Sequence, residues 1–356
     1  MKPLKRIAVT AGVIVVVGAT ALVARTLVMG GMFTEVKPLA LKCDTLTGVT
    51  GAEDIAIDRK TGLIFASATD RRATPDRPSK IDGIYVRALA HPENGFVKLA
   101  GAPAVFHPHG ISLFRAADGS LTLMAVNHIS MKQHAVDIFE VKIDGDKVSL
   151  NEIGDIQSDK LNSPNDVAAV GKERFYVTND HGSRTPFGMT LESYLMLPRA
   201  DVLYFDGSVF KEVAAGLVFA NGIALSNDGK RIYVAESTAR HIQTFGRDPF
   251  SGKLTLESTF TLPSGPDNID IDDRGDLWIA THPKMFALVA YASDPTKPSP
   301  SEVYRVAAGG GIPQSATEVY ANAGQQIGAA SVAVAAQDHL FIGSIFDPKI
   351  LDCRLP

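Results

Sequence analysis

The sequence predicts an all-β protein, a six-bladed β-propeller, because a short segment that begins polar and turns apolar recurs six times along the 356 residues. The first four segments start 56 residues apart, and the last two intervals are 46 and 63 residues. A multi-stranded repeat of roughly 40–50 residues is typical of propeller blades. The six segments begin at Glu53, His109, Asn165, Asn221, Asp267 and Ala330.

Each repeat contains enough strands for a blade. The segment continues as a short strand, then a polar turn, then an apolar strand such as LIFASA, RFYVTND or DLWIATH, and in four of the six repeats the turn ends in Gly. Glycine supplies the positive φ that these turns use. Further strands, such as DGIYVRAL and VDIFEVKI, complete units of four strands. A β-sandwich would repeat at shorter spacing, and an α/β fold would show helical periodicity between strands.

Residues 1–30 stand apart from the propeller that is predicted for residues 31–356. Ile7–Ala24 is an uncharged run of 18 residues with basic residues on both sides. As a helix it would span about 27 Å, close to the thickness of the bilayer core. An uncleaved signal anchor and a signal peptide cleaved near Ala19 or Ala21 both remain open. Either way, we expect the propeller outside the cytoplasm, membrane-anchored or secreted.

The two cysteines, Cys43 and Cys353, lie at opposite ends of the predicted propeller. Outside the cytoplasm such a pair can form a disulfide, and a ring must join its first and last strands. We therefore expect a bridge, with two unpaired buried thiols as the alternative. In the chain-entropy model, closing so long a loop stabilises the fold by about 5–6 kcal/mol.

Composition narrows the function classes. The hydrophobic content of 45%, the charged content of 21% and the net charge of −4 are typical of a packed globular protein. A basic patch is missing from the sequence, which disfavours a nucleic-acid partner. The sequence also lacks a Gly-x-Ser-x-Gly elbow and a His-Glu-x-x-His motif, which disfavours a serine triad and zinc. The oligomeric state stays open.

The starts of the repeats carry polar side chains in register. In a propeller the innermost strands line a central channel, so five successive blades offer oxygen or imidazole groups near one mouth. Carboxylates at close quarters repel unless a cation lies between them. Oxygen ligands without sulfur, in this number, suit calcium. The starts are Glu53-Asp54, His109-Gly110, Asn165-Asp166, Asn221-Gly222 and Asp267-Asn268.

These segments resemble the paraoxonase/arylesterase family from about Cys43 to Cys353. The matching stretches are GAEDIAID, HPHGISLF, AVNH, NDVAAVGKERFYVTNDHG, FANGIALSNDGKRIYVAE, PDNIDID, GDLWIATHP and FIGSIFDPKILDC. The resemblance implies two calcium ions and hydrolysis of lactones and carboxylic esters. It implies a catalytic calcium held by Glu53, Asn165, Asn221, Asp267 and Asn268. It implies a structural calcium held by Asp54, Asp166 and the backbone carbonyl of Ile111.

The resemblance also implies a pair of histidines, His109 and His128. We expect a substrate carbonyl on the catalytic calcium, a water deprotonated by His109, and His128 orienting the ring of His109. His181 and His282 end second strands and are further candidates for lining the pocket.

Substrate preference is predicted from the segment after His181, which reads GSRTPFGMTLESYLMLPRAD. It corresponds to the family's active-site lid but is shorter and less aromatic. Its apolar stretch Tyr194–Pro198 favours an acyl or aryl substrate. Two alternatives remain: a gluconolactonase-like sugar lactonase with a more polar pocket, and a non-catalytic binding propeller that uses calcium only for rigidity.

Overall fold

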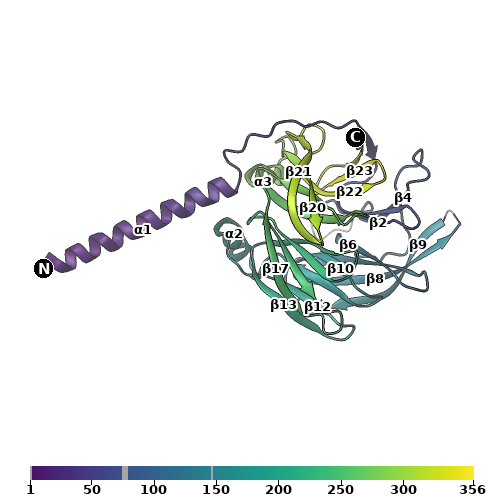
Figure 1. Ribbon diagram of the computed structural model, residues 1–356, viewed down its shortest axis with the longest axis horizontal. Helices are drawn as coiled ribbons and strands as arrows, with labels where there is room; N and C mark the ends of the chain where they lie inside the picture. The colour runs from purple at the N-terminus through teal and green to yellow at the C-terminus, as the bar shows by residue number, and fades with distance from the viewer. Residues whose placement is uncertain (1, 74–78, 146) are drawn as a thin grey trace.

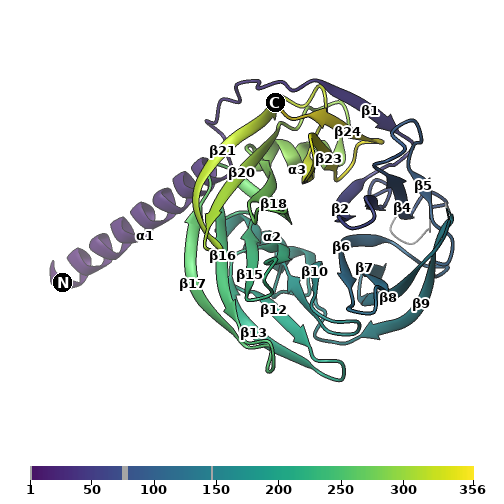
Figure 2. The same cartoon turned by 45° about the vertical axis from the view of Figure 1, so that its right-hand side comes forward.

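The fold is known from a computed structural model that describes residues 2–73, 79–145 and 147–356, without the side chains of residues 2–12, 14 and 15. The chain forms six four-stranded antiparallel sheets, and these are arranged in a ring around a central axis (Figure 2). The predicted six-bladed β-propeller is therefore confirmed. The predicted turns are confirmed as well, because Gly62, Gly119, Gly229 and Gly275 all have φ values between 71° and 86°.

The blades follow one another in chain order, and in each the first strand is the innermost. Blade 1 contains β2 (Ala52–Asp58), β3 (Leu63–Ala68), β4 (Gly83–Ala88) and β5 (Val97–Lys98). Blade 2 contains β6 (Pro108–Arg115), β7 (Leu121–Ser130), β8 (Gln133–Asp144) and β9 (Lys147–Gln157). Blade 3 contains β10 (Pro164–Ala169), β11 (Phe175–Asn179), β12 (Ala200–Phe205) and β13 (Phe210–Leu217).

The second half of the ring repeats this plan. Blade 4 contains β14 (Ala220–Leu225), β15 (Arg231–Glu236), β16 (His241–Arg247) and β17 (Leu254–Thr261). Blade 5 contains β18 (Gly265–Ile271), β19 (Leu277–His282), β20 (Ser301–Gly309) and β21 (Ile312–Asn322). Blade 6 contains β22 (Ala330–Ala336), β23 (His339–Ser344), β24 (Lys349–Arg354) and, as its outermost strand, β1 (Cys43–Thr47).

The ring is closed by β1, which comes from the start of the chain and pairs with β24 at its end. Cys43 lies directly opposite Cys353 in this register, and the two form a disulfide. The predicted bridge is confirmed, and no free cysteine remains. Because the first and last strands belong to one sheet, neither can leave the ring without breaking that sheet.

The core is divided among the contacts between blades. Each of six clusters of buried apolar side chains draws its residues from two neighbouring blades; for example, Tyr176 of blade 3 packs with Val234 of blade 4. Burial of these side chains holds every blade against both of its neighbours. The inner strands therefore have fixed positions around the channel.

All six inner strands contain a β-bulge at the same place, the start of the repeat. The register shifts lie between Ala52 and Asp54 in β2 and between Pro164 and Val167 in β10, and the other four strands shift at matching positions. A bulge re-aims side chains that would otherwise alternate between the faces of the sheet. Consecutive residues such as Glu53 and Asp54 can therefore both face the channel.

The described residues include three helices besides the propeller strands. α1 (Lys2–Met29) projects away from it, while α2 (Pro186–Leu195) and α3 (Met285–Ser293) lie on the propeller near the end of α1 (Figure 1). In the part of the chain that the structure describes, we find no helix with the length and apolarity needed to cross a membrane.

The C-terminal end of α1 is attached to blade 4 by Arg240. The guanidinium of Arg240 donates to the carbonyl oxygen of Met29 at 2.7 Å and to that of Val28 at 3.2 Å. Thr26 Oγ1 donates to the carbonyl oxygen of Tyr194, the penultimate residue of α2, at 2.8 Å. Cationic groups at the carbonyl end of a helix are stabilising, so the last turn of α1 packs as part of the folded unit.

Candidate metal and catalytic centre

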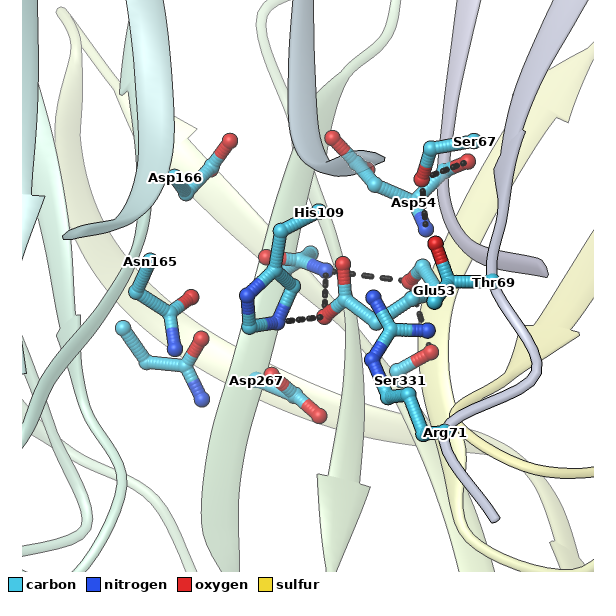
Figure 3. Close-up of polar contacts among 12 residues, drawn as sticks. Glu53, Asp54, Ser67, Thr69, Arg71, His109, Asn165, Asp166, Asp267 and Ser331 are labelled. Carbon is cyan, nitrogen blue, oxygen red and sulfur yellow. Dashed lines mark hydrogen bonds and ion pairs between the residues drawn. The ribbon is translucent and has the colours of Figure 1, made fainter. Parts of the chain in front are cut away.

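The predicted ligands come together at one mouth of the channel. Glu53, Asn165 and Asp267 lie on three different inner strands, and Figure 3 shows their polar groups gathered around one space beside His109. Asn268 joins the group, because its Nδ2 donates to Glu53 Oε1 at 2.8 Å. The set is buried, with Glu53 only 2% exposed and Asn268 only 1% exposed.

Four oxygens of this set have no hydrogen-bond partner among the residues that the structure describes. They are Glu53 Oε2 and the Oδ1 atoms of Asn165, Asn221 and Asn268. A buried oxygen without a partner costs roughly 1–3 kcal/mol, so four in one place are unusual. A hard cation with oxygen ligands would satisfy all four, and the residues present therefore fit the calcium that the sequence predicts.

Hydrogen bonds donated by the side-chain nitrogens of the asparagines orient their amide groups. Asn165 Nδ2 donates to Asp180 Oδ2 at 3.2 Å, and Asn221 Nδ2 donates to Ser237 Oγ at 2.9 Å. Because each NH2 group is already bonded, each amide oxygen remains available as a ligand. The sequence revealed the asparagines but not the partners that orient them.

Asp267 is held from behind by His282. His282 Nε2 lies 2.7 Å from Asp267 Oδ2, and His282 is only 2% exposed. Burial raises the pKa of Asp267, against the opposing effect of His282. Burial also disfavours the charged form of Glu53, but His109 and Arg71 outweigh it and lower its pKa. The structure thus places His282 behind a candidate ligand rather than in the lining of a pocket.

This site does not show the usual signature of a metal site, a cluster of at least three His, Cys, Asp or Glu side chains, within the described residues. Among residues 2–73, 79–145 and 147–356, no three His, Cys, Asp or Glu side chains are arranged to hold a metal ion. The predicted set differs from such clusters because three of its five members are asparagines. Amide oxygens are good calcium ligands. The evidence for a metal site here is therefore the group of oxygens that lack a hydrogen-bond partner among the described residues.

The predicted structural-calcium residues Asp54, Ile111 and Asp166 line one pocket among the inner strands. Asp54 accepts hydrogen bonds from the amides of Ile55 and Ile111 at 2.8 and 2.7 Å. Asp166 accepts from the amides of Val167 and Ile223 at 2.7 and 2.8 Å. Burial first, and then Glu53 for Asp54 and Asp54 for Asp166, raise both pKa values well above the usual value.

Gly110 is required by this arrangement. A Cβ atom at position 110 would lie 2.2 Å from Asp166 Oδ1 and 2.4 Å from Asp166 Cα. The two residues of the His-Gly pair therefore serve different purposes. The histidine faces the channel, and the glycine allows the next inner strand to approach closely.

The predicted histidine pair is in contact. His109 Nδ1 lies 2.8 Å from His128 Nε2, and His109 Nε2 lies 3.5 Å from Glu53 Oε1. The structure therefore brings His109 next to the candidate metal ligands and places His128 behind it. Their catalytic roles stay predictions. A third histidine, His134, continues the contact from His128 and was missed from the sequence.

A family model described as Arylesterase matches residues 77–355. The chain belongs to the arylesterase family. Serum paraoxonase/arylesterase 2 of Rattus norvegicus is 36% identical over 324 residues, which cover 88% of this chain and 88% of the relative. Serum paraoxonase/arylesterase 1 of Homo sapiens is 34% identical over 334 residues, which cover 90% and 91% of the two chains. The family predicted from the sequence motifs is confirmed.

Solved structures share the fold of this arylesterase-family chain. A luciferin-regenerating enzyme matches with a TM-score of 0.52 at 15% identity, covering 88% of this chain and 95% of its own. A gluconolactonase from Xanthomonas campestris matches with a TM-score of 0.51 at 19% identity, covering 91% and 99%. At these identities the likeness concerns the fold alone.

His181, the other predicted pocket histidine of this family member, connects the lid region to the ligands. Its Nδ1 lies 2.6 Å from Asp180 Oδ1, and its Nε2 lies 2.8 Å from the hydroxyl of Ser193 in α2. Burial lowers the pKa of His181, but the contact with Asp180 outweighs it and raises the value overall. Since Asp180 also accepts from Asn165, α2 is linked to a candidate ligand through two side chains.

Arg71 is a site residue that sequence reasoning missed. Its guanidinium donates to the carbonyl oxygens of Gly51 and Pro108, both at 3.2 Å, and Figure 3 shows it beside Glu53. Burial lowers the pKa of Arg71, while Glu53 is the largest opposing influence. Nothing in the Arg-Arg pair of the sequence distinguishes this half-buried arginine from one on the surface.

An apolar pocket of about 190 Å³ lies between the end of α1 and the two short helices. Its lining includes Met29 of α1, Tyr194 of α2 and Phe286 of α3, and the rings of Tyr194 and Phe286 stack with centroids 6.1 Å apart. The candidate ligands and His109 do not contribute to it. The predicted lid segment therefore contains a helix, and its apolar residues form a pocket with α3.

Proposed function

We propose that the protein is a calcium-dependent hydrolase of lactones and of aryl and other carboxylic esters. The observation that carries the proposal is the set of four buried, unpartnered ligand oxygens beside His109. Membership of the arylesterase family and the names of the paraoxonase/arylesterase relatives support an esterase or lactonase. The residues that would hold the catalytic calcium are Glu53, Asn165, Asn221, Asp267 and Asn268.

The chemistry divides between the metal site and the histidines. A bound calcium ion supplies polarisation of the substrate carbonyl and stabilisation of negative charge on its oxygen. His109 Nε2 points to the side of Glu53, and at this position it would accept a proton from the attacking water. His128 holds the opposite nitrogen of His109 and so keeps the ring aimed at the site.

A second calcium ion, held by Asp54, Asp166 and the carbonyl of Ile111, would act structurally. Both carboxylates are buried, and burial raises both pKa values; repulsion from Glu53 raises the pKa of Asp54 further, and repulsion from Asp54 raises that of Asp166. A cation between them would remove this repulsion. The ion would thereby connect blades 1, 2 and 3 at the centre of the ring.

The test is a substrate panel run on the full chain in calcium and in chelator. An aryl acetate, an N-acyl homoserine lactone and gluconolactone distinguish the substrate classes. The apolar stretch Tyr194–Pro198 of the lid segment favours the acyl lactone and the aryl ester. Turnover of gluconolactone alone would instead make the protein a sugar lactonase. Tight calcium binding with no turnover of any substrate would make it a binding propeller and refute the proposal.

We also propose that the propeller lies outside the cytoplasm and that α1 anchors it to a membrane. The disulfide supports the compartment, because such bonds persist in oxidising surroundings. The described part of α1 exposes Val16, Val17 and Val23, and its last turn is fastened by Arg240. Any cleavage should therefore leave residues after about Ala24 in place. The mass of the mature protein, and its release or retention in alkaline carbonate, test both points.

A further inference from the structure

Three histidines form a continuous chain of contacts across blade 2. His109 lies on β6, His128 on β7 and His134 on β8, and these strands succeed one another from the channel outward (Figure 2). The distance from His109 Nδ1 to His128 Nε2 is 2.8 Å, and that from His128 Nδ1 to His134 Nδ1 is 2.9 Å. His134 is partly exposed, so the chain connects the candidate site with solvent.

The chemistry of neutral imidazole limits this chain to two proton arrangements. Each ring has one N–H donor and one acceptor nitrogen, and each contact needs one of each. If His134 donates inward, His109 carries its hydrogen on Nε2 and offers no base to the site. If His109 donates outward from Nδ1, then His128 donates to His134 Nδ1, and His109 Nε2 has a free lone pair. The tautomer of His134 therefore determines whether Nε2 of His109 can act as a base.

We propose that His134 is the outer member of a three-histidine proton relay between the candidate site and solvent. This proposal rests on the hydrolase function proposed above and extends it. His134 acts through His128 and does not touch the substrate, so it is a positioning and relay residue. The relay stands on the two contacts between the rings and on the partial exposure of His134.

The proton balance closes over one turnover. When water adds to the carbonyl, its proton moves to His109 Nε2, the Nδ1 proton of His109 moves to His128 Nε2, and the Nδ1 proton of His128 moves to His134 Nδ1. His134 then releases its Nε2 proton to solvent. When the C–O bond of the leaving group breaks, the same shifts run inward, and the leaving alkoxide receives the proton from His109 Nε2. Each ring gains and loses one proton in each direction and ends in its first tautomer.

The surroundings keep the middle of the relay neutral. Burial first, and then the neighbouring His109, lower the pKa of His128 well below its usual value. Burial also lowers the pKa of His134, where Asp180 and Arg184 act in opposite directions. Neutral rings can pass a proton either way, whereas a ring held as imidazolium would stop the inward shift.

The relay makes a prediction that packing alone does not. An alkoxide leaving group needs a proton, whereas a phenolate leaves without one. In the full chain saturated with calcium, we expect His134→Ala to lower kcat for a lactone by about 10–100-fold with little change in KM. The loss for an aryl acetate should be smaller. Added imidazole should restore lactone turnover to His134→Ala but not to His109→Gln.

Matched variants separate the relay from a structural role. His134→Gln keeps a polar side chain of similar reach that cannot carry the proton, so its lactone kcat should fall without a fall in Tm. His91→Ala removes an exposed histidine of blade 1 and should change neither quantity. A kcat of His134→Ala within twofold of wild type, or a loss that imidazole does not restore, would overturn the relay. Since wild-type turnover is measured alongside, this failure is distinct from failure of the proposed function.

A second readout needs no turnover. The ¹⁵N NMR shifts of the ring nitrogens report which nitrogen of each histidine carries the hydrogen. In wild type we expect hydrogen on Nδ1 of both His109 and His128, and a mixture of tautomers in His134→Ala. Tautomers of His109 and His128 that are the same in both proteins would contradict the proposal.

Discussion

Asn268 Nδ2 donates to Glu53 Oε1 at 2.8 Å, although the two residues are 215 positions apart in the chain. The same nitrogen reaches the backbone oxygen of Glu53 at 3.1 Å. The amide of Asn268 is thereby fixed with its Oδ1 free, next to the unpartnered Oε2 of Glu53. Two inner strands from blades 1 and 5 thus present a pair of oxygens placed to bind a cation.

Asn268→Ala should weaken calcium binding by at least about 10–100-fold, because it removes one ligand oxygen and releases the carboxylate of Glu53. Titration calorimetry with calcium on chelator-treated protein measures the affinity. Asn94→Ala, in an exposed turn of blade 1, is the control and should bind as wild type does. An unchanged affinity in Asn268→Ala would remove this residue from the proposed ligand set.

Chelation should destabilise the propeller as well as inactivate it. Without a cation, the buried carboxylates of Glu53, Asp54, Asp166 and Asp267 must repel one another or take up protons. We therefore expect a lower Tm in EGTA, restored by calcium and much less by magnesium, which prefers fewer protein ligands. Calorimetric melting in the three conditions measures this. Equal Tm values with and without chelator would argue against both ions.

Gly110→Ala should be strongly destabilising, by more than about 2 kcal/mol, because its Cβ would press on both the backbone and the carboxylate of Asp166. Urea denaturation in saturating calcium gives the free energy of unfolding. Gly95→Ala is the matched control, since a Cβ there meets nothing within 4 Å. If both variants unfold alike, the close approach of the inner strands at Gly110 is wrong.

Replacing both cysteines by serine should lower the free energy of unfolding by about 5–6 kcal/mol in the chain-entropy model. The disulfide links β1 to β24 across a sequence separation of 310 residues, and so long a closed loop greatly reduces the conformational entropy of the unfolded chain. Wild-type protein treated with a reductant should approach the stability of the variant. A double variant as stable as oxidised wild type would show that strand pairing alone closes the ring.

Asp137 should make stability fall as pH rises. This carboxyl is 1% exposed on β8 and accepts from Asn127 Nδ2 at 2.9 Å, and burial raises its pKa to about 7. The unfolded chain releases the same proton near pH 4, so the penalty grows between about pH 4 and 7 and is complete above that range.

The free energy of unfolding of Asp137→Asn, relative to that of wild type, should therefore increase by about 2–4 kcal/mol between pH 4.5 and pH 8. Urea denaturation at the two pH values measures it. Asp144→Asn changes an exposed carboxylate at the end of the same strand and should track wild type at both pH values. A constant difference between Asp137→Asn and wild type would mean that Asp137 ionises normally in the folded protein.

How far the site could be foreseen differs from residue to residue. Glu53, His109, Asn165, Asn221 and Asp267 were identified from the sequence because each occupies the same position of a repeat, and equal positions in a propeller share one mouth of the channel. His134 and Arg71 belong to no repeat position. His282 could be seen to end a strand, but not to turn behind Asp267 rather than into a pocket.

The sequence by itself determined the number of blades, the strands that line the channel, the chemical character of the channel mouth and the ring closure by Cys43 and Cys353. These features follow from patterns along the chain, because alternation, turn residues and the repeat interval are local. The tertiary structure decided which oxygens lack a partner among the described residues and how the bulges turn neighbouring residues such as Glu53 and Asp54. It also decided that His109 contacts His128 and that His128 contacts His134. These relationships join different strands, and their distances exist only once burial between the blades has brought the strands to fixed positions.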